Sequence, residues 1–167
     1  MNSAGLVGSR SLGSRSLGSR SYLVWIETDD PRFPGWVAIR QEILRDPLGL
    51  EYSPEDLLAE RDDSHLLFFD GPNLLGGLIV RPTSENETWK IRQVAVAEST
   101  QGRGIGRILM NEAMRRAQEV GISRLLLHAR EDVIGFYEVL GFKVEGEPFN
   151  EVSIPHRRMS LSAPFRP

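Results

Sequence analysis

Three glycines alternate with larger residues in the short stretch QGRGIG, at positions 101–106. The stretch follows the apolar run QVAVA and precedes the amphipathic run ILMNEAMRRAQEV, so it connects a predicted strand to a predicted helix. The first turn of a helix has backbone N–H groups without intrahelical partners, and the helix dipole adds about half a positive charge there. Because glycine lets the backbone approach an anion closely, the stretch predicts a diphosphate site.

The polar residues of this stretch suit the same ligand. Arg103 and Arg107 lie one helical turn apart and can face one edge of a phosphate, with Gln101 at the mouth. The spacing G-x-G-x-G differs from the G-x-G-x-x-G of dinucleotide folds and from the P-loop, which disfavours a nucleotide-dependent redox enzyme. A tight turn without a ligand is the structural alternative. The coincidence of three glycines with Gln101 and two arginines favours the anion site.

Hydrophobic patterning predicts the elements around the glycine stretch. The predicted strands cover residues 22–26, 65–70, 73–82, 88–97, 123–129, 142–146 and 154–161. The predicted helices cover residues 36–44, 54–60, 104–120 and 133–140. Arg40 and Arg45 are expected on the exposed face of the first of these helices. The order of elements predicts one α/β or α+β domain, with a mixed sheet and helices on its faces.

Composition excludes several classes of protein. The 167 residues are 40% hydrophobic and 26% charged, which is ordinary for one globular domain. Cysteine is absent, so disulfides, thiolate metal sites and cysteine nucleophiles are excluded. The net charge of −3 predicts no general attraction to nucleic acid or to anionic membranes. No apolar run approaches the roughly 20 residues of a membrane helix.

The first 21 residues differ from the rest of the chain. They repeat the unit GSRSL and contain arginines but no acidic residue. Glycine and serine do not build a core, so residues 1–21 are predicted to be a flexible low-complexity tail before a domain at 22–167. A transit peptide has a similar composition, although the regular glycines disfavour an amphipathic helix, and an added leader is the alternative. The absence of a secretory apolar segment predicts a cytoplasmic location.

Two segments resemble the GNAT superfamily of N-acetyltransferases. Residues 94–110, VAVAESTQGRGIGRILM, resemble its acyl-coenzyme-A motif Q/R-x-x-G-x-G/A, which Gln101, Gly104 and Gly106 match. Residues 135–149, GFYEVLGFKVEGEPF, resemble the family's xFYxxLGF element, and EPFNEVSIPHRRM resembles a bacterial subgroup of unassigned acceptor. The resemblance implies a single GNAT-like domain with a mixed, mostly antiparallel sheet of six to seven strands and about four flanking helices.

The same resemblance implies acetyl-CoA as co-substrate. In the family, the strand before the glycine loop diverges from its parallel neighbour, and the pantetheine arm lies in the gap. The backbone N–H of Val94 would polarise the thioester carbonyl. The residues that would bind the cofactor are Val94, Ala95, Val96, Gln101, Gly102, Arg103, Gly104, Ile105, Gly106, Arg107 and Phe136. No metal is expected, since the three histidines are scattered and H-x-x-x-H is absent.

The implied reaction is direct attack of a primary amine on the thioester. Such an amine, with a pKa of about 10.4, is mostly protonated at pH 7, a deficit of roughly 4–5 kcal/mol, so a base must take its proton. Tyr137 matches the family tyrosine near the sulfur and is the candidate donor to the departing thiolate. The family's strand glutamate is replaced by Arg92-Gln93, which leaves His128 as the candidate base. A packing role for Tyr137 and a structural role for His128 are the alternatives.

Three further residues are candidates to bind the acceptor. His156 and Glu151 lie near the C-terminal strand, and Glu42 lies on the first helix. Each could instead be a solvated surface group. The expected partner is a small-molecule or peptide amine, with neither nucleic acid nor membrane, and family members often form a homodimer. A binding module that holds acyl-CoA without turnover is the alternative function.

Overall fold

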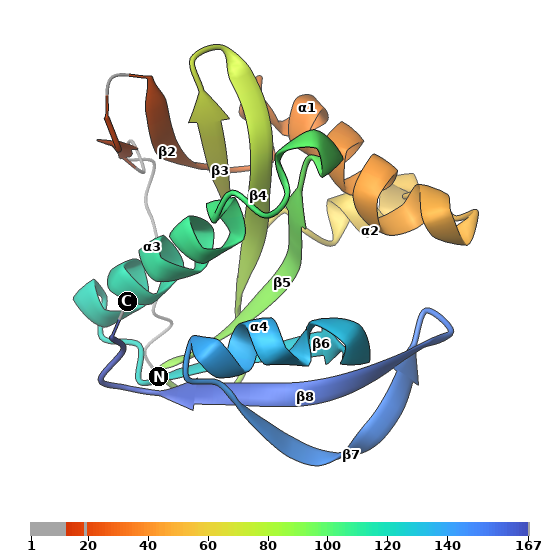
Figure 1. Cartoon of the computed structure of the whole chain (residues 1–167), viewed down its shortest axis with the longest axis vertical. Coiled ribbons are helices and arrows are strands. Elements are labelled where there is room, and N and C mark those ends of the chain that lie inside the picture. The colour runs from red at the N-terminus through yellow and green to blue at the C-terminus, as the bar shows by residue number, and fades with distance from the viewer. Residues whose placement is uncertain (1–12, 19, 167) are drawn as a thin grey trace.

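The computed structural model of the protein describes residues 13–18 and 20–166. Eight strands within these residues form one sheet in the order β1-β2-β3-β4-β5-β6-β8-β7, and every neighbouring pair except β5–β6 is antiparallel (Figure 1). The strands are β1 Ser14–Ser16, β2 Ser21–Ile26, β3 Ser64–Asp70, β4 Asn73–Pro82, β5 Thr88–Val96, β6 Arg124–Arg130, β7 Lys143–Glu151 and β8 Ile154–Ser162. The predicted single domain with a mostly antiparallel sheet is confirmed.

Four α-helices in the described part of the chain flank this sheet. They are α1 Phe33–Arg40, α2 Pro54–Leu58, α3 Ile105–Glu119 and α4 Ile134–Val139. A π-helical segment at Gln41–Arg45 continues α1, and short 3-10 turns occur at Asp46–Leu48, Glu98–Thr100 and Glu131–Val133. The first helix begins three residues earlier than predicted because Pro34 lies in its first turn, where proline is favoured, and not in a preceding loop.

Part of the predicted tail belongs to the sheet. Ser14–Ser16 pairs antiparallel with β2, and Nη1 of Arg15 lies 3.1 Å from a carboxylate oxygen of Glu112 on α3. The side chains of β1 are exposed, so no apolar pattern marks this strand in the sequence. Residues 1–12 and 19 of the predicted tail lie outside the described residues.

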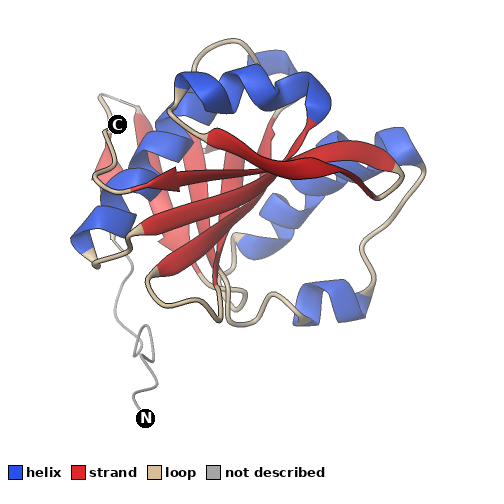
Figure 2. Cartoon of the chain, turned by 90° about the horizontal axis from the view of Figure 1, so that it is seen from below, coloured by secondary structure: helices blue, strands red, loops and turns tan. Residues whose placement is uncertain are grey.

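The sheet has an apolar core on each face, and Figure 2 shows helices on both sides. Leu66 and Phe68 of β3 belong to the core under α3 and α4, whereas Leu67 and Phe69 belong to the core under α1. This alternation follows from the two-residue period of a strand. Helix α3 contributes a fully buried stripe, which consists of Leu109, Met110, Ala113, Met114 and Ala117.

The only parallel pair among the described strands separates partway along its length. The pairing of β5 with β6 runs from Thr88↔Arg124 to Ile91↔Leu127. Beyond this point β5 continues beside β4, and β6 continues beside β8. Figure 1 shows β5 rising away from β6. The two strands therefore form a fork, which opens below the start of α3.

Candidate functional site

The glycine loop at 101–106 connects the end of β5 to the start of α3, as predicted. Gly102 and Gly104 have φ of 79° and 80°, a left-handed conformation that glycine adopts without strain. Gly104 is the N-cap of α3, and no side chain caps the helix. A Cβ added at Gly102 or Gly104 would meet no atom within 4 Å, so the loop faces open space and is not filled by neighbouring side chains.

The other residues of the loop have different environments. Arg103 and Arg107 are exposed beside the loop, and Nε2 of Gln101 donates to the carbonyl of Val96 at 3.0 Å. The side chain of Ile105 is buried in the core, so only its backbone can face a ligand. A Cβ at Gly106 would lie 3.4 Å from the ring of Phe136, which places α4 against the loop.

A bulge interrupts β5 where it leaves β6. Arg92 pairs with Ile79 and Ala95 pairs with Gly77, so Gln93 and Val94 together face one residue of β4. Gln93 has a φ of 50°, which is uncommon for a residue other than glycine. Within the described residues, no strand pairs with the edge of β5 that faces the fork beyond Ile91. Except for the carbonyl of Val96, which accepts from Gln101, the backbone of Val94–Val96 on this edge is thus available to an extended ligand.

Tyr137 lies in the core on the α3 face of the sheet. Its ring packs edge-on against Phe136 and Phe142, at centroid distances of 5.0 and 5.9 Å. Burial raises the pKa of the Tyr137 hydroxyl above its usual range. The hydroxyl therefore keeps its proton at neutral pH and can donate a hydrogen bond.

Three other predicted residues meet on the opposite face of the sheet. His128 of β6 lies between Leu127 and Ala129, which belong to the α3 core, and so its side chain points to the other face. Its Nδ1 lies 3.2 Å from Oε1 of Glu151, and Oε2 of Glu151 lies 3.7 Å from Nε2 of His156. One carboxylate thus bridges the two histidines.

Two residues that the sequence analysis did not single out complete this group. Nζ of Lys90 lies 3.3 Å from Nδ1 of His128. The ring of Phe149 packs against both His128 and His156, at centroid distances of 4.9 and 6.0 Å. Lys90 is a charged residue between the apolar residues Trp89 and Ile91 of β5, and this was the available signal. We call Lys90, His128, Phe149, Glu151 and His156 the histidine cluster.

The electrostatics of the histidine cluster favour a neutral His128. Burial lowers the pKa of His128 and the charge of Lys90 adds to this effect, against the opposing carboxylate of Glu151. Burial also lowers the pKa of Lys90. Burial would raise the pKa of Glu151, but the His128 hydrogen bond and the neighbouring positive charges outweigh it and leave that pKa lowered. When Nδ1 of His128 carries a proton it donates to Glu151, and when it carries none it accepts from Lys90. The protonation of this one atom therefore decides which of the two hydrogen bonds forms.

Two expectations on the first helix have different outcomes. Glu42 is exposed, and among the described residues it has no hydrogen bond or ion pair, so it does not join the histidine cluster. The expectation that Arg40 is exposed is wrong: Arg40 is fully buried, with Nη1 2.7 Å from Oε1 of Glu60. The carboxylate of Glu60, which is twenty residues away in sequence, neutralises the charge of the Arg40 guanidinium. The helical pattern alone predicts that this charge faces solvent.

Two further properties bear on the kind of site. Across residues 13–18 and 20–166, no three histidine, aspartate or glutamate side chains are grouped as metal ligands. In the same part of the chain, no helix combines the length and the apolar character of a membrane span.

Comparisons with known proteins agree with this geometry. A model of the acetyltransferase (GNAT) family matches residues 23–142. An acetyltransferase of Bacillus subtilis is 30% identical over 114 residues, which are 68% of this chain and 76% of that protein. The fold is similar to that of an N-acetyltransferase from Lactobacillus plantarum, with a TM-score of 0.78, 19% identity and coverage of 86% and 99% of the two chains. A Bacillus subtilis acetyltransferase solved in complex with CoA has a TM-score of 0.65, with 19% identity and coverage of 84% and 97%.

Proposed function

Because the chain belongs to the acetyltransferase (GNAT) family, we propose that it transfers an acetyl group from acetyl-CoA to a primary amine of a small molecule or a peptide. The proposal rests on the glycine loop, which is open to solvent at the uncapped start of α3 and lies beside the fork between β5 and β6. A diphosphate needs backbone N–H donors without steric obstruction, and a pantetheine arm needs an unpaired strand edge. The loop and the fork supply both, next to each other.

The proposed cofactor site follows the chain from the loop to the fork. The N–H groups of 102–107, with Arg103 and Arg107, bind the diphosphate. The free edge of Val94–Val96 binds the pantetheine amides. The N–H of Val94 stabilises the negative charge that develops on the thioester oxygen, and such donors contribute most when fixed in a site that excludes water. Phe136 covers the loop from α4.

The proposed proton transfers use the two faces of the sheet. On the face of α1, neutral His128 takes a proton from the ammonium group of the acceptor, and Glu151 stabilises the imidazolium that forms. The lowered pKa of His128 keeps the base unprotonated at neutral pH. On the face of α3, Tyr137 donates its proton to the departing thiolate. His156 and Glu151 form one wall of the acceptor site.

Thiol release tests this proposal. The protein is mixed with acetyl-CoA and a panel of small and peptide amines, and free thiol is followed together with the acetylated amine. We expect equal amounts of thiol and acetylated product, and no thiol without an acceptor. Binding of acetyl-CoA without thiol release for any amine would support the alternative, a module that holds acyl-CoA without turnover, which the absence of the family's strand glutamate keeps open.

A further inference from the structure

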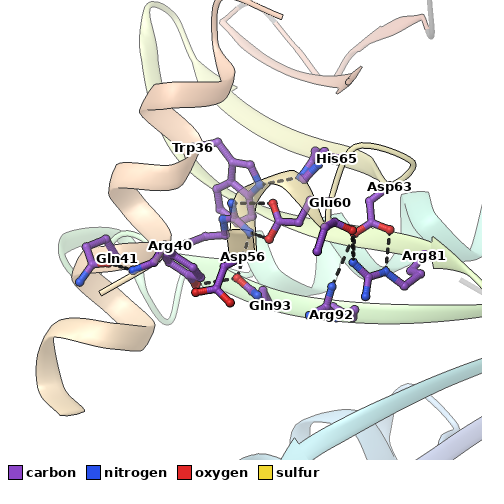
Figure 3. Close-up of polar contacts among 12 residues, drawn as sticks. Trp36, Arg40, Gln41, Asp56, Glu60, Asp63, His65, Arg81, Arg92 and Gln93 are labelled. Carbon is purple, nitrogen blue, oxygen red and sulfur yellow. Dashed lines mark hydrogen bonds and ion pairs between the residues drawn. The ribbon is translucent and has the colours of Figure 1, made fainter. Parts of the chain in front are cut away.

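We propose that Arg40, Glu60 and Tyr52 are positioning residues that hold the side chain of Gln93 and thereby fix the bulge of β5. The inference rests on the proposed function, because it assigns these residues to the placement of the Val94 N–H at the thioester. We call the four residues the Gln93 clamp. Figure 3 shows Arg40 and Glu60 facing one another, with Gln93 beside them.

Two hydrogen bonds of the Gln93 clamp converge on one atom of Gln93. Oε1 of Gln93 accepts from Nη1 of Arg40 at 2.9 Å and from the hydroxyl of Tyr52 at 2.6 Å. The two terminal guanidinium nitrogens of Arg40, Nη1 and Nη2, donate to the carboxylate of Glu60, at 2.7 and 3.0 Å. The orientation of the Gln93 side chain is therefore set by residues from α1, from the segment before α2 and from the segment after it.

Burial makes the clamp more specific than an apolar contact would be. Arg40 is fully buried and Glu60 is nearly so, and the guanidinium lies over the rings of Trp36 and Tyr52, at 5.2 and 5.0 Å from their centroids. Removal of an ion pair from water is costly in free energy, and apolar residues of similar volume often give a fold equal stability. An ion pair with an N–H group left over to donate to a strand residue fixes the orientation of that residue's side chain, which apolar residues do not.

The bulge that the clamp reaches is itself an unfavourable conformation. The positive φ of Gln93 persists only if surrounding contacts impose it. Beyond the bulge the two strands approach closely: a Cβ at Gly76, which pairs with Val96, would lie 2.7 Å from the carbonyl oxygen of Ala95. The side-chain hydrogen bonds of Gln93 thus hold the bulge itself, and the close approach at Gly76 fixes β5 beyond it.

The bulge lies directly before the residue whose N–H is proposed to bind the thioester oxygen. Gln93 directly precedes Val94, and pairing between β5 and β6 ends two residues before Gln93. A change in the backbone of Gln93 would therefore turn the N–H of Val94, while the glycine loop at 101–106 would keep its position. The expected signature is a loss of kcat with little change in the binding of CoA.

Two variants test the clamp, with one matched control. Gln93→Ala removes both acceptor contacts, and Tyr52→Phe removes one hydroxyl while the ring stays. Tyr22→Phe is the control, because it is the same chemical change at a residue that stacks on Phe69, away from the fork. We expect kcat to fall about fivefold in Tyr52→Phe. In Gln93→Ala we expect a larger fall, bounded by the roughly 100- to 1,000-fold loss typical of a missing oxyanion donor.

Two readouts separate positioning from stability. The KM for acetyl-CoA and the Kd for CoA should stay within about twofold of the unmutated protein in both variants. Without substrate, amide hydrogen exchange at Ala95, which pairs with Gly77 just beyond the bulge, should be faster in Gln93→Ala than in the unmutated protein and unchanged in Tyr22→Phe. A Gln93→Ala protein with unchanged exchange at the Ala95 amide would overturn the clamp, even if the unmutated protein released no thiol. Absence of thiol release alone would overturn the proposed function and not the clamp.

Discussion

His65 is a buried histidine whose neutral form couples the stability of the protein to pH. Its side chain is fully buried, and its Nδ1 accepts a hydrogen bond from Nε1 of Trp36 at 3.1 Å. Burial lowers the pKa of His65 to about 3, and the positive charges of Arg40, Arg92 and Arg81 add to the effect. In the unfolded chain the pKa of a histidine is about 6.5.

The size and the sign of the effect follow from these two values. Because the folded state has the lower pKa, the unfolded state binds the proton first, and stability is present above pH 6.5 and lost as pH falls towards 3. From pH 7 to pH 5, this one site should lower the free energy of unfolding by roughly 2 kcal/mol. The complete loss, near pH 3, is on the order of 5 kcal/mol.

Urea unfolding of the unmutated protein and of His65→Asn, at pH 7, 6 and 5, measures this contribution. Asparagine keeps an acceptor for Trp36 but has no proton to gain. Other titrating groups are common to both proteins, so the difference between their unfolding free energies isolates His65. We expect the advantage of the unmutated protein to shrink by about 2 kcal/mol between pH 7 and pH 5. Two stability curves that stay parallel across this range would refute the reasoning.

Three further changes test the proposed site. Gly104→Glu should abolish CoA binding in calorimetry, because it places a carboxylate in the phosphate space. Gly121→Glu is the control: Gly121 has an equal φ of 80° and lies beyond the other end of α3, so the substitution should cause the same strain of roughly 1–2 kcal/mol while CoA still binds. Tyr137→Phe should lower kcat at least tenfold with little change in the KM for acetyl-CoA, and an unchanged kcat would remove its role as donor. In the unmutated protein the acid limb of the pH–rate profile should lie below pH 6.5, because the pKa of His128 is lowered. His128→Ala should remove this limb, and an unaltered profile would exclude His128 as the base.

The parts of the fold that follow a local period were predictable. The long helix α3 has apolar residues at successive i+4 positions, and Leu109, Ala113 and Ala117 are indeed fully buried. The glycine loop was predictable because three glycines interrupt two regular patterns. By contrast, β1 depends on backbone pairing with β2, and its exposed side chains leave no apolar signature.

The contacts of the candidate site depend on strand register, which the sequence does not display. His128, Glu151 and His156 were each singled out, but their meeting requires β8 to lie between β6 and β7. The burial of Arg40 was missed because its partner Glu60 comes from another segment. The homodimer, the cytoplasmic location and the identity of the acceptor stay predictions, since they concern other molecules and not the contacts within this chain.

The most direct measurement of the central claim is a titration of isotope-labelled protein with CoA, followed by the backbone amide resonances. We expect the amides of 102–107 and of Val94–Val96 to shift together and to saturate together. Pantetheine, which lacks the diphosphate, should shift only the strand amides. A protein that binds CoA with its shifts located elsewhere, or that leaves the loop amides unmoved at saturation, would contradict the assignment of this loop as the diphosphate site of an acyl-transfer enzyme.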